Sequence, residues 1–167
     1  FTGAHENLTI EVRTKSAGGE FFRQQTAAER VVFAFTISPQ AVIDRYEHGT
    51  PGLAQRIACV QTALEAGFQV RLCFDPMIYC ADWKQEYGSM MKQILNVVDM
   101  SKLLDVSIGS FRISQDYLKK MRKQEPCSAV VQFPFENKGG VYQYQTKLQE
   151  QMEECLMEWL LKEIPKE

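Results

Sequence analysis

The chain has 167 residues and a formal net charge of -2, with 45% apolar and 24% charged residues. This composition is typical of a single globular domain, and it excludes both a disordered chain and a module that binds nucleic acid through bulk positive charge. We find no apolar run of the roughly 18 residues that a membrane span needs and no signal-peptide pattern. The five cysteines are an odd number without the spacing of a disulfide framework, so we expect reduced thiols and a cytoplasmic location.

Strand and helix patterns alternate along the chain. Residues 8–14 alternate apolar and polar side chains, as a half-buried strand does. Residues 31–37 and 68–74 are apolar runs rich in β-branched and aromatic residues, which is typical of strands buried on both faces of a parallel sheet. A fourth strand is predicted at 103–111, and helices are predicted at 20–27, at 39–47, from 53 to 66, after Asp82 and at 114–123.

The pattern changes after Pro126. Two predicted strands, 129–133 and 141–144, flank a loop that contains Asn-Lys-Gly-Gly, which indicates a β-hairpin. Apolar residues at helical spacing then predict a terminal helix. The sequence therefore predicts an α/β fold with parallel strands that alternate with helices, in a (β/α) barrel or part of one, followed by a hairpin and a helix.

Polar side chains follow each predicted strand, and in parallel α/β sheets ligands bind at these carboxyl ends. Two interpretations stay open: the residues form one binding rim, or they cap helices and turns. The residues are Thr14, Lys15, Ser16, Thr36, Ser38, Gln40, Asp75, Ser110 and Arg112.

Motifs that would name a reaction are absent from the sequence. It contains no G-x-G-x-x-G, no P-loop and no G-x-S-x-G. The two histidines are far apart, and Cys73 and Cys80 do not have zinc-finger spacing, so we expect no metal ligands. The residues alone indicate an α/β ligand-binding scaffold.

An ordered set of short motifs adds to this interpretation. Thr14-Lys15 closes the first strand, and residues 32–38 are followed by the stretch 42–50. The helix 56–66, Ala-Gly-Phe at 66–68, Asp75-Pro76 and Trp83 complete the order. With this spacing, the chain from about Leu8 to its final helix resembles the second half of the spore photoproduct lyase family of radical S-adenosylmethionine proteins.

The resemblance implies a partial TIM-like barrel and a radical mechanism. In such proteins a [4Fe-4S] cluster, bound by three cysteines spaced C-x3-C-x2-C, cleaves S-adenosylmethionine to a radical that splits an ultraviolet-induced thymine dimer in DNA. This sequence has no such triplet, so none of its five cysteines takes that role. We therefore expect a C-terminal part that starts at Phe1, is catalytically inactive alone and works with an upstream half. Residues 1–125 would form the half barrel, and 126–167 would complete the same domain.

The resemblance also implies cofactor contacts at the strand ends. Lys15 matches a strand-end lysine of the family, and its ammonium would meet the carboxylate or a ribose hydroxyl of S-adenosylmethionine. Thr36 or Ser38, with Ser38 preferred, matches a strand-end serine. Asp75 lies where the family places backbone beside the adenine or the ribose.

A second implied contact is with DNA, through the C-terminal hairpin. Tyr142 and Tyr144 match aromatic residues that would stack on a base, while Asn137 and Lys138 lie at the tip, where Lys138 would meet a phosphate. Glu136 departs from the cationic pattern of the family. A plain sheet-edge hairpin is the alternative.

Two other functions and one mode of self-association also agree with the sequence. A small complete α/β domain that binds a nucleotide or a protein partner, without radical chemistry, is the alternative to the lyase interpretation. A nucleic-acid-binding module that uses only the hairpin is a third possibility. A half barrel would also leave two open sheet edges, so we expect the chain to dimerise through them.

Overall fold

The structure, a computed structural model, describes residue 5 and residues 7–163. Its centre is a four-stranded sheet in the order β1-β2-β3-β4, and every neighbouring pair is parallel. The predicted parallel sheet is thus confirmed. Phe1 and residues 164–167 of the predicted terminal segment lie outside the described residues. The four strands are β1 (Ile10–Thr14), β2 (Val31–Thr36), β3 (Gln69–Met77) and β4 (Asp105–Ser110).

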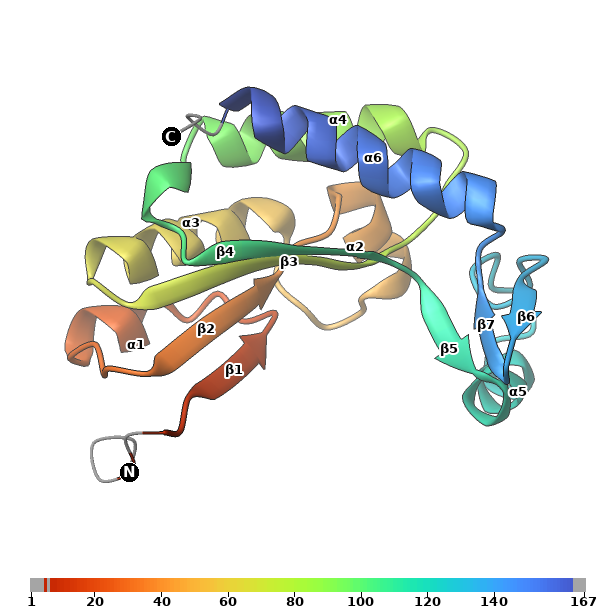
Figure 1. Ribbon diagram of the computed structural model, residues 1–167, viewed down its shortest axis with the longest axis horizontal. Helices are drawn as coiled ribbons and strands as arrows, with labels where there is room; N and C mark the ends of the chain where they lie inside the picture. Colours follow the sequence, from red (N-terminus) through yellow and green to blue (C-terminus); the bar gives the residue numbers. More distant parts are fainter. Residues whose placement is uncertain (1–4, 6, 164–167) are drawn as a thin grey trace.

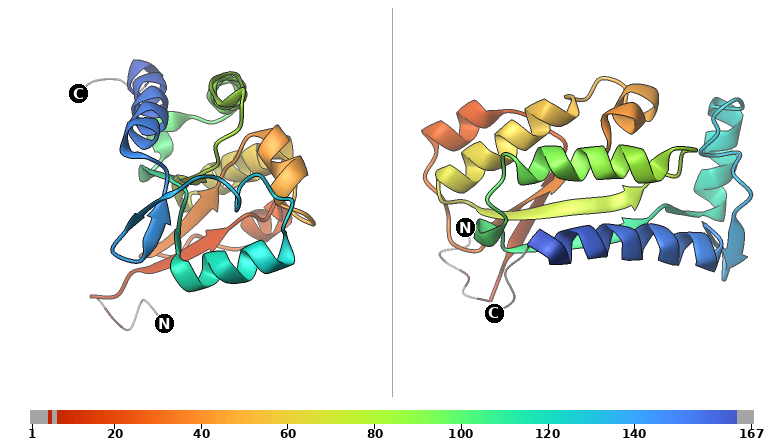
Figure 2. Two further views of the ribbon diagram at one scale, coloured as in Figure 1. Left: turned by 90° about the vertical axis from the view of Figure 1, so that its right-hand side faces the viewer. Right: turned by 90° about the horizontal axis from the view of Figure 1, so that it is seen from above.

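Helices alternate with these strands, and α3, α4 and α6 lie over one face of the sheet (Figure 1). The view from above in Figure 2 shows α4 and α6 running nearly side by side along β3 and β4. The helices are α1 (Gly19–Gln24), α2 (Gln40–Tyr46), α3 (Leu53–Glu65), α4 (Trp83–Leu95), the 3-10 turn η2 (Met100–Lys102), α5 (Gln115–Gln124) and α6 (Thr146–Glu163).

The helix-covered face of the sheet is the hydrophobic core. Phe35 lies in register opposite Leu72, and both are almost completely buried with the inner faces of α3 and α4. The ring of Phe22 on α1 packs edge-on against Phe33 and Phe68, with centroids 4.9 and 5.1 Å apart. Burial of this apolar surface is the main driving force for the fold.

The opposite face of the sheet carries charged side chains beside the buried Val32, Ala34 and Cys73. Arg71 of β3 lies between Ala34 and Asp105 in the register of the sheet. Its guanidinium bonds both oxygens of Asp105 and also pairs with Glu11 of β1. The hydrogen bonds from Arg71 lower the pKa of Asp105. A sheet with one apolar and one charged face indicates that the charged face meets solvent or a polar ligand rather than a second core.

The C-terminal region forms a small antiparallel sheet in the order β5-β7-β6, beyond the carboxyl ends of the four parallel strands (Figure 1). Its strands are β5 (Arg112–Ser114), β6 (Glu136–Lys138) and β7 (Val141–Gln143). Gly139 and Gly140 form the hairpin turn with φ values of +61° and +87°, which favour glycine.

The predicted first arm of the hairpin is wrong. Residues 129–133 form turns, and β6 begins only at Glu136. Val130 packs in a small cluster with Val42 and Ile78. The backbone N–H of Gln132 donates to the carbonyl of Ser128. The apolar run is therefore explained by local burial in a loop rather than by strand pairing.

Helix α6 covers the outer side of β4. The backbone N–H of Ser110, at the end of β4, donates to the Glu153 carboxylate at 2.8 Å. Trp159 packs on Gly88 of α4, where a Cβ would lie 3.6 Å from the indole ring. Within the described residues, no helix is long and apolar enough to cross a membrane, and the five cysteines form no disulfide.

We expect the packing of α6 to depend on its buried face. Met152 is completely buried and Met157 is 46% exposed on the same helix. Met152→Ala should lower the free energy of unfolding by about 2–5 kcal/mol, because it leaves a cavity, whereas Met157→Ala should change it by less than about 0.5 kcal/mol. Urea denaturation of both variants measures the difference, and equal effects would contradict this packing.

Candidate functional site

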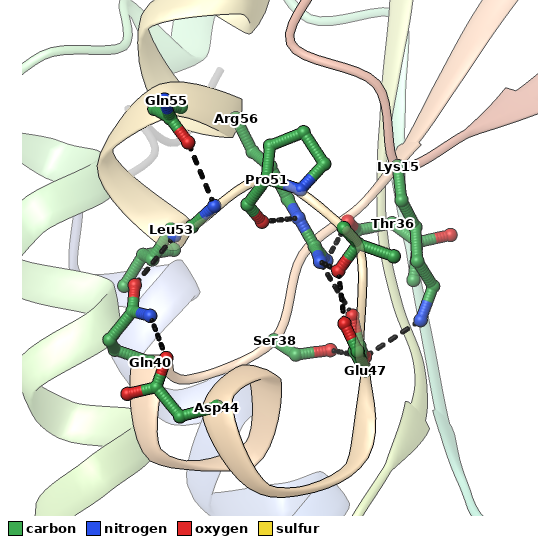
Figure 3. Close-up of polar contacts among 12 residues, drawn as sticks. Lys15, Thr36, Ser38, Gln40, Asp44, Glu47, Pro51, Leu53, Gln55 and Arg56 are labelled. Carbon is green, nitrogen blue, oxygen red and sulfur yellow. Dashed lines mark hydrogen bonds and ion pairs between the residues drawn. The ribbon is translucent and has the colours of Figure 1, made fainter.

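The candidate site begins with an arginine that is completely buried beneath the carboxyl ends of β1 and β2. Arg56 lies on α3 and is 0% exposed. Its Nε donates to the Pro51 carbonyl at 2.9 Å, and its Nη1 donates to the Thr36 carbonyl at 3.2 Å (Figure 3). Nη2 donates to Glu47 and to the Thr50 hydroxyl, each at 2.6 Å. A buried guanidinium must satisfy its donors in this way, so Arg56 ties α3 to the end of β2 and to the loop after α2.

Glu47 is the acidic centre of this network. Besides Arg56, it accepts hydrogen bonds from the Ser38 hydroxyl at 2.8 Å and pairs with the Lys15 ammonium at 2.7 Å (Figure 3). Burial acts to raise the pKa of Glu47, but the hydrogen bonds from Lys15, Arg56 and Ser38 outweigh it, so this pKa lies below its ordinary value. Glu47 is therefore a carboxylate held by three donors from β1, the end of β2 and α3.

A second set of contacts orients the loop between α2 and α3. The Gln40 amide donates to Asp44 at 2.6 Å and accepts from the backbone N–H of Leu53 at 2.8 Å, while Gln55 accepts from the N–H of Gly52 at 3.0 Å. These bonds satisfy two of the first N–H groups of α3, which have no partner within the helix itself. The loop that carries Glu47 and Thr50 is thus fixed at both ends.

Lys15 is the accessible member of the network. Its side chain is 35% exposed, compared with 1% for Arg56. An ammonium group has three donor protons, and among the described residues Glu47 is the partner of Lys15. Two N–H groups therefore remain for an anionic or hydroxyl ligand while Glu47 holds the side chain in place.

A cavity of about 450 Å³ opens beside Lys15. Its lining residues come from α2 and the two residues after it, from the end of α5 and the loop 127–131, and from Lys15, Pro76, Ile78 and Phe111. Its volume is in the range of small-molecule sites, and its lining combines apolar side chains with a few charged ones.

Asp75 has a different set of partners. Its carboxylate lies 3.8 Å from Arg13 and 3.5 Å from Arg112, and the side chain is 19% exposed. A Cβ on Gly109 would come within 3.1 Å of this carboxyl group, so glycine leaves the space that Asp75 occupies. Asp75 therefore belongs to the charged face of the sheet rather than to the Glu47 network.

The hairpin residues differ in their accessibility. Lys138 is half exposed, donates to the Thr146 hydroxyl at 2.7 Å and lies 3.8 Å from Glu136. Asn137 accepts from the N–H of Gly140 and so stabilises the turn, while the Tyr142 ring is half-buried.

Tyr144 is placed differently from the sequence-based expectation. It is 1% exposed, its ring packs edge-on against Phe133 at 4.9 Å, and its hydroxyl accepts from the N–H of Tyr79. Burial raises the pKa of Tyr144 to about 12. In this structure its ring faces the core, where a base cannot stack on it.

Of the predicted cofactor residues, the structure brings Lys15, Thr36 and Ser38 together and leaves Asp75 with the charged face. Sequence reasoning missed Glu47 and Arg56. The sequence does contain a pattern that marks Arg56. It follows Leu53 by three residues and precedes Val60 by four, so this charged side chain lies on the apolar stripe of α3. No comparable pattern marks Glu47, which follows the end of α2.

The fold and the site together define an α/β protein with a network of polar side chains at the carboxyl edge of a parallel sheet, the edge at which such folds bind ligands. The model of the spore photoproduct lyase family matches residues 1–167, so the chain belongs to this family. The spore photoproduct lyase of Clostridium acetobutylicum is 29% identical over 92 residues, which are 55% of this chain and 27% of that protein.

Solved structures are similar in fold. A spore photoproduct lyase double mutant with bound AdoMet and dinucleoside spore photoproduct has a TM-score of 0.80 and 17% identity. Another spore photoproduct lyase, complexed with dinucleoside spore photoproduct, has a TM-score of 0.79 and 16% identity. Each comparison covers 98% of this chain and 51% of the other, so the chain spans about half the length of these relatives.

The acid stability of the fold should depend on Glu47. Because the folded pKa of Glu47 is lowered, its stabilising contribution is present above the ordinary glutamate pKa of about 4.3 and is lost as the pH falls through the folded value. Glu47→Gln should cost about 3 kcal/mol at pH 7, because it removes the counterion of buried Arg56. It should also make the free energy of unfolding less dependent on pH below 5.

Denaturant titrations between pH 3 and 7 measure both effects. Glu154→Gln is the matched control, because Glu154 is exposed on α6 and has no role in the network. The interpretation fails if Glu47→Gln keeps the wild-type dependence on pH.

Proposed function

We propose that this chain supplies the cofactor- and lesion-contacting part of a radical S-adenosylmethionine enzyme that repairs an ultraviolet-induced thymine dimer in DNA. Family membership supports the proposal, as does the arrangement of Lys15 at the carboxyl edge of the sheet. The observation that carries it is an ammonium fixed by Glu47 with donors left over at the edge where α/β sheets bind ligands.

The chain would form one segment of a partial (β/α) barrel. The four parallel strands would be the barrel wall, with the helices outside and the charged face of Arg71, Asp105 and Glu11 turned inward. Residues 1–125 would make this half barrel, while the hairpin and α6 in 126–167 complete the same domain. The polar inner face supports this arrangement, because a cofactor cavity needs polar walls that a packed core does not.

S-adenosylmethionine would lie across the ends of β1–β3. Lys15 would donate to its carboxylate or a ribose hydroxyl, and the edge around Thr36, Ser38 and Asp75 would border its adenosine. Thr36 and Ser38 are buried, and the Ser38 hydroxyl already bonds Glu47, so we propose that Ser38 acts by holding Glu47 and hence Lys15. The cofactor supplies the radical when it is bound and reduced, and the chain's own residues bind it and exclude water.

A [4Fe-4S] cluster does not fit the residues present. The sequence has no C-x3-C-x2-C, and no three metal-ligating side chains gather within the part of the chain that the structure describes. The cluster would be bound by cysteines outside these 167 residues, on an upstream half, in a cytoplasmic protein.

DNA would meet the hairpin. Lys138 would contact a phosphate once it leaves Thr146, Asn137 would shape the tip, and the half-exposed Tyr142 would contact a base. Buried Tyr144 would anchor the hairpin on the core. Glu136 near Lys138 limits the positive charge, so we expect modest affinity and strong dependence on salt.

Variants of two lysines test the cofactor contact and the DNA contact independently. Lys15→Ala should weaken S-adenosylmethionine binding by about fivefold, because one charge-assisted hydrogen bond to an exposed group is lost, and it should leave oligonucleotide binding unchanged. Lys138→Ala should weaken oligonucleotide binding and leave S-adenosylmethionine binding unchanged. Isothermal titration calorimetry at low salt measures both ligands. If both variants bind S-adenosylmethionine and the oligonucleotide as the wild-type chain does, these residue roles are wrong.

Self-association through an open sheet edge is also proposed, and the unpaired side of β1 supports it. In the described part of the chain β1 and β4 each have a strand on one side alone, and the last N–H of β4, that of Ser110, is already bonded to Glu153 of α6. Unpaired strand edges attract further strands. Light scattering of the isolated chain should show a dimer, and a strictly monomeric chain would count against this edge contact.

The alternative is an α/β domain that binds nucleotides without radical chemistry, and the cavity beside Lys15 favours it. It predicts that S-adenosylmethionine binds no more tightly than adenosine. Competition between these two ligands distinguishes the two functions.

A further inference from the structure

Helix α6 carries opposite charges on its two exposed flanks, and neither the strand-end network nor the hairpin uses them. We propose that this helix, together with α4, forms an interface between two copies of the chain, in which an acidic flank of each copy packs into a basic groove of the other. The inference goes beyond the proposed function and does not rest on it, because none of the cofactor- or DNA-contacting residues lies on this surface.

The basic groove lies between α4 and α6 and has a volume of about 510 Å³. Gly88 of α4 lines it, and the Trp159 ring of α6 lies 3.6 Å from the point where a Cβ on Gly88 would be. Met91 and Leu95 add apolar surface, and no carboxylate is among the described residues that line the groove. Its charged lining residues are Lys84, Lys92 and Lys162.

The three lysines of the basic groove are exposed and form no ion pair with an acidic side chain among the described residues. Lys84 contacts the Trp83 ring instead, with its Nζ 5.6 Å from the ring centroid. Positive charges that line one groove repel one another, and this repulsion is relieved when carboxylates enter the groove. The groove therefore favours an acidic occupant.

The acidic flank lies on the side of α6 that faces Ile108 of β4 rather than α4. It consists of Glu154, Met157, Glu158 and Leu161, in which the two glutamates and the two apolar residues are each one turn apart. Met157 and Leu161 are 46% and 56% exposed. All four residues line a second groove, of about 380 Å³, whose described lining contains no cation. Exposed apolar side chains bordered by charges are typical of a surface that a partner covers.

The geometry of α6 allows both contacts to form at the same time. The left view of Figure 2 looks nearly along α4 and α6 and shows α6 at the margin of the helix layer, where a second copy can approach. The basic groove and the acidic flank lie on either side of the exposed ridge of α6. A two-fold axis parallel to this helix therefore turns the acidic flank of each copy toward the basic groove of the other, and the resulting interface is self-complementary and closed.

A second copy suits this surface better than nucleic acid does. Phosphates would pair with the lysines of the basic groove, but they would leave Met157 and Leu161 in water and would be repelled by the glutamates beside them. A second copy neutralises both charged surfaces and covers the apolar side chains. An upstream half at β1 would leave this interface free, because β1 and β4 are at opposite edges of the sheet and α6 lies beside β4.

Charge reversal on the 167-residue chain tests the interface. The double variant Lys84→Glu/Lys92→Glu reverses the basic groove, and Glu154→Lys/Glu158→Lys reverses the acidic flank. Each should raise the dissociation constant of the dimer about tenfold in sedimentation velocity, because like charges then face each other twice. The matched control is Lys119→Glu/Lys123→Glu, which changes the net charge equally at exposed positions of α5 and should associate as the wild type does.

An equimolar mixture of the two test variants gives the sharper result. In the mixed dimer the reversed groove of one copy faces the reversed flank of the other, and the unaltered groove faces the unaltered flank. The mixture should therefore associate as tightly as the wild-type chain, a rescue that damage to the fold of either variant would not produce. A mixture that associates no better than its two components would overturn the inference.

Two other results would also overturn the inference. The first is association that is the same in the wild type and in both test variants, which would assign self-association to another surface such as the unpaired side of β1. The second is a monomeric wild-type chain whose binding to a DNA duplex is lost in Lys84→Glu/Lys92→Glu, which would assign the basic groove to nucleic acid. Neither result changes the cofactor contact of Lys15, which S-adenosylmethionine binding tests separately.

Discussion

The buried guanidinium of Arg56 is the interaction on which the site depends. A full positive charge without exposure is tolerated only because two backbone carbonyls, a hydroxyl and the Glu47 carboxylate surround it. These partners come from the end of β2 and from the loop between α2 and α3. One side chain thus fixes the geometry of the sheet edge, and Glu47 in turn holds Lys15 at the point where a ligand can reach it.

The two faces of the parallel sheet carry different kinds of side chains. One face is covered by α3, α4 and α6 (Figure 1) and supplies the hydrophobic core. The other face carries Arg71 and its two acidic partners. The fold therefore needs no second apolar layer and leaves a charged surface beside the strand ends. This surface, the Glu47 network and the cavity are neighbours because parallel strands bring all their carboxyl ends to one edge.

The sequence predicted the regular elements well where the pattern was long and periodic. The strands at 31–37 and 68–74 and the helix after Asp82 are present within a few residues of the predicted ends. It failed at 129–133, where an apolar run looks the same whether it pairs in a sheet or packs in a loop. Tyr144 shows a similar limit, because it lies one residue beyond β7, where the alternation of a strand no longer decides the direction of a side chain.

The sequence by itself determined the parallel α/β class, the family and the polar residues at the strand ends, because periodicity and motif order are local properties of the chain. Only the tertiary structure decided which of those residues act together. Lys15, Ser38, Glu47 and Arg56 are far apart in the sequence, and their contacts exist because β1, β2, α2 and α3 meet at one edge. The cavity likewise joins α2 to a loop some 80 residues later, an approach that the packing of Val42 on Val130 creates.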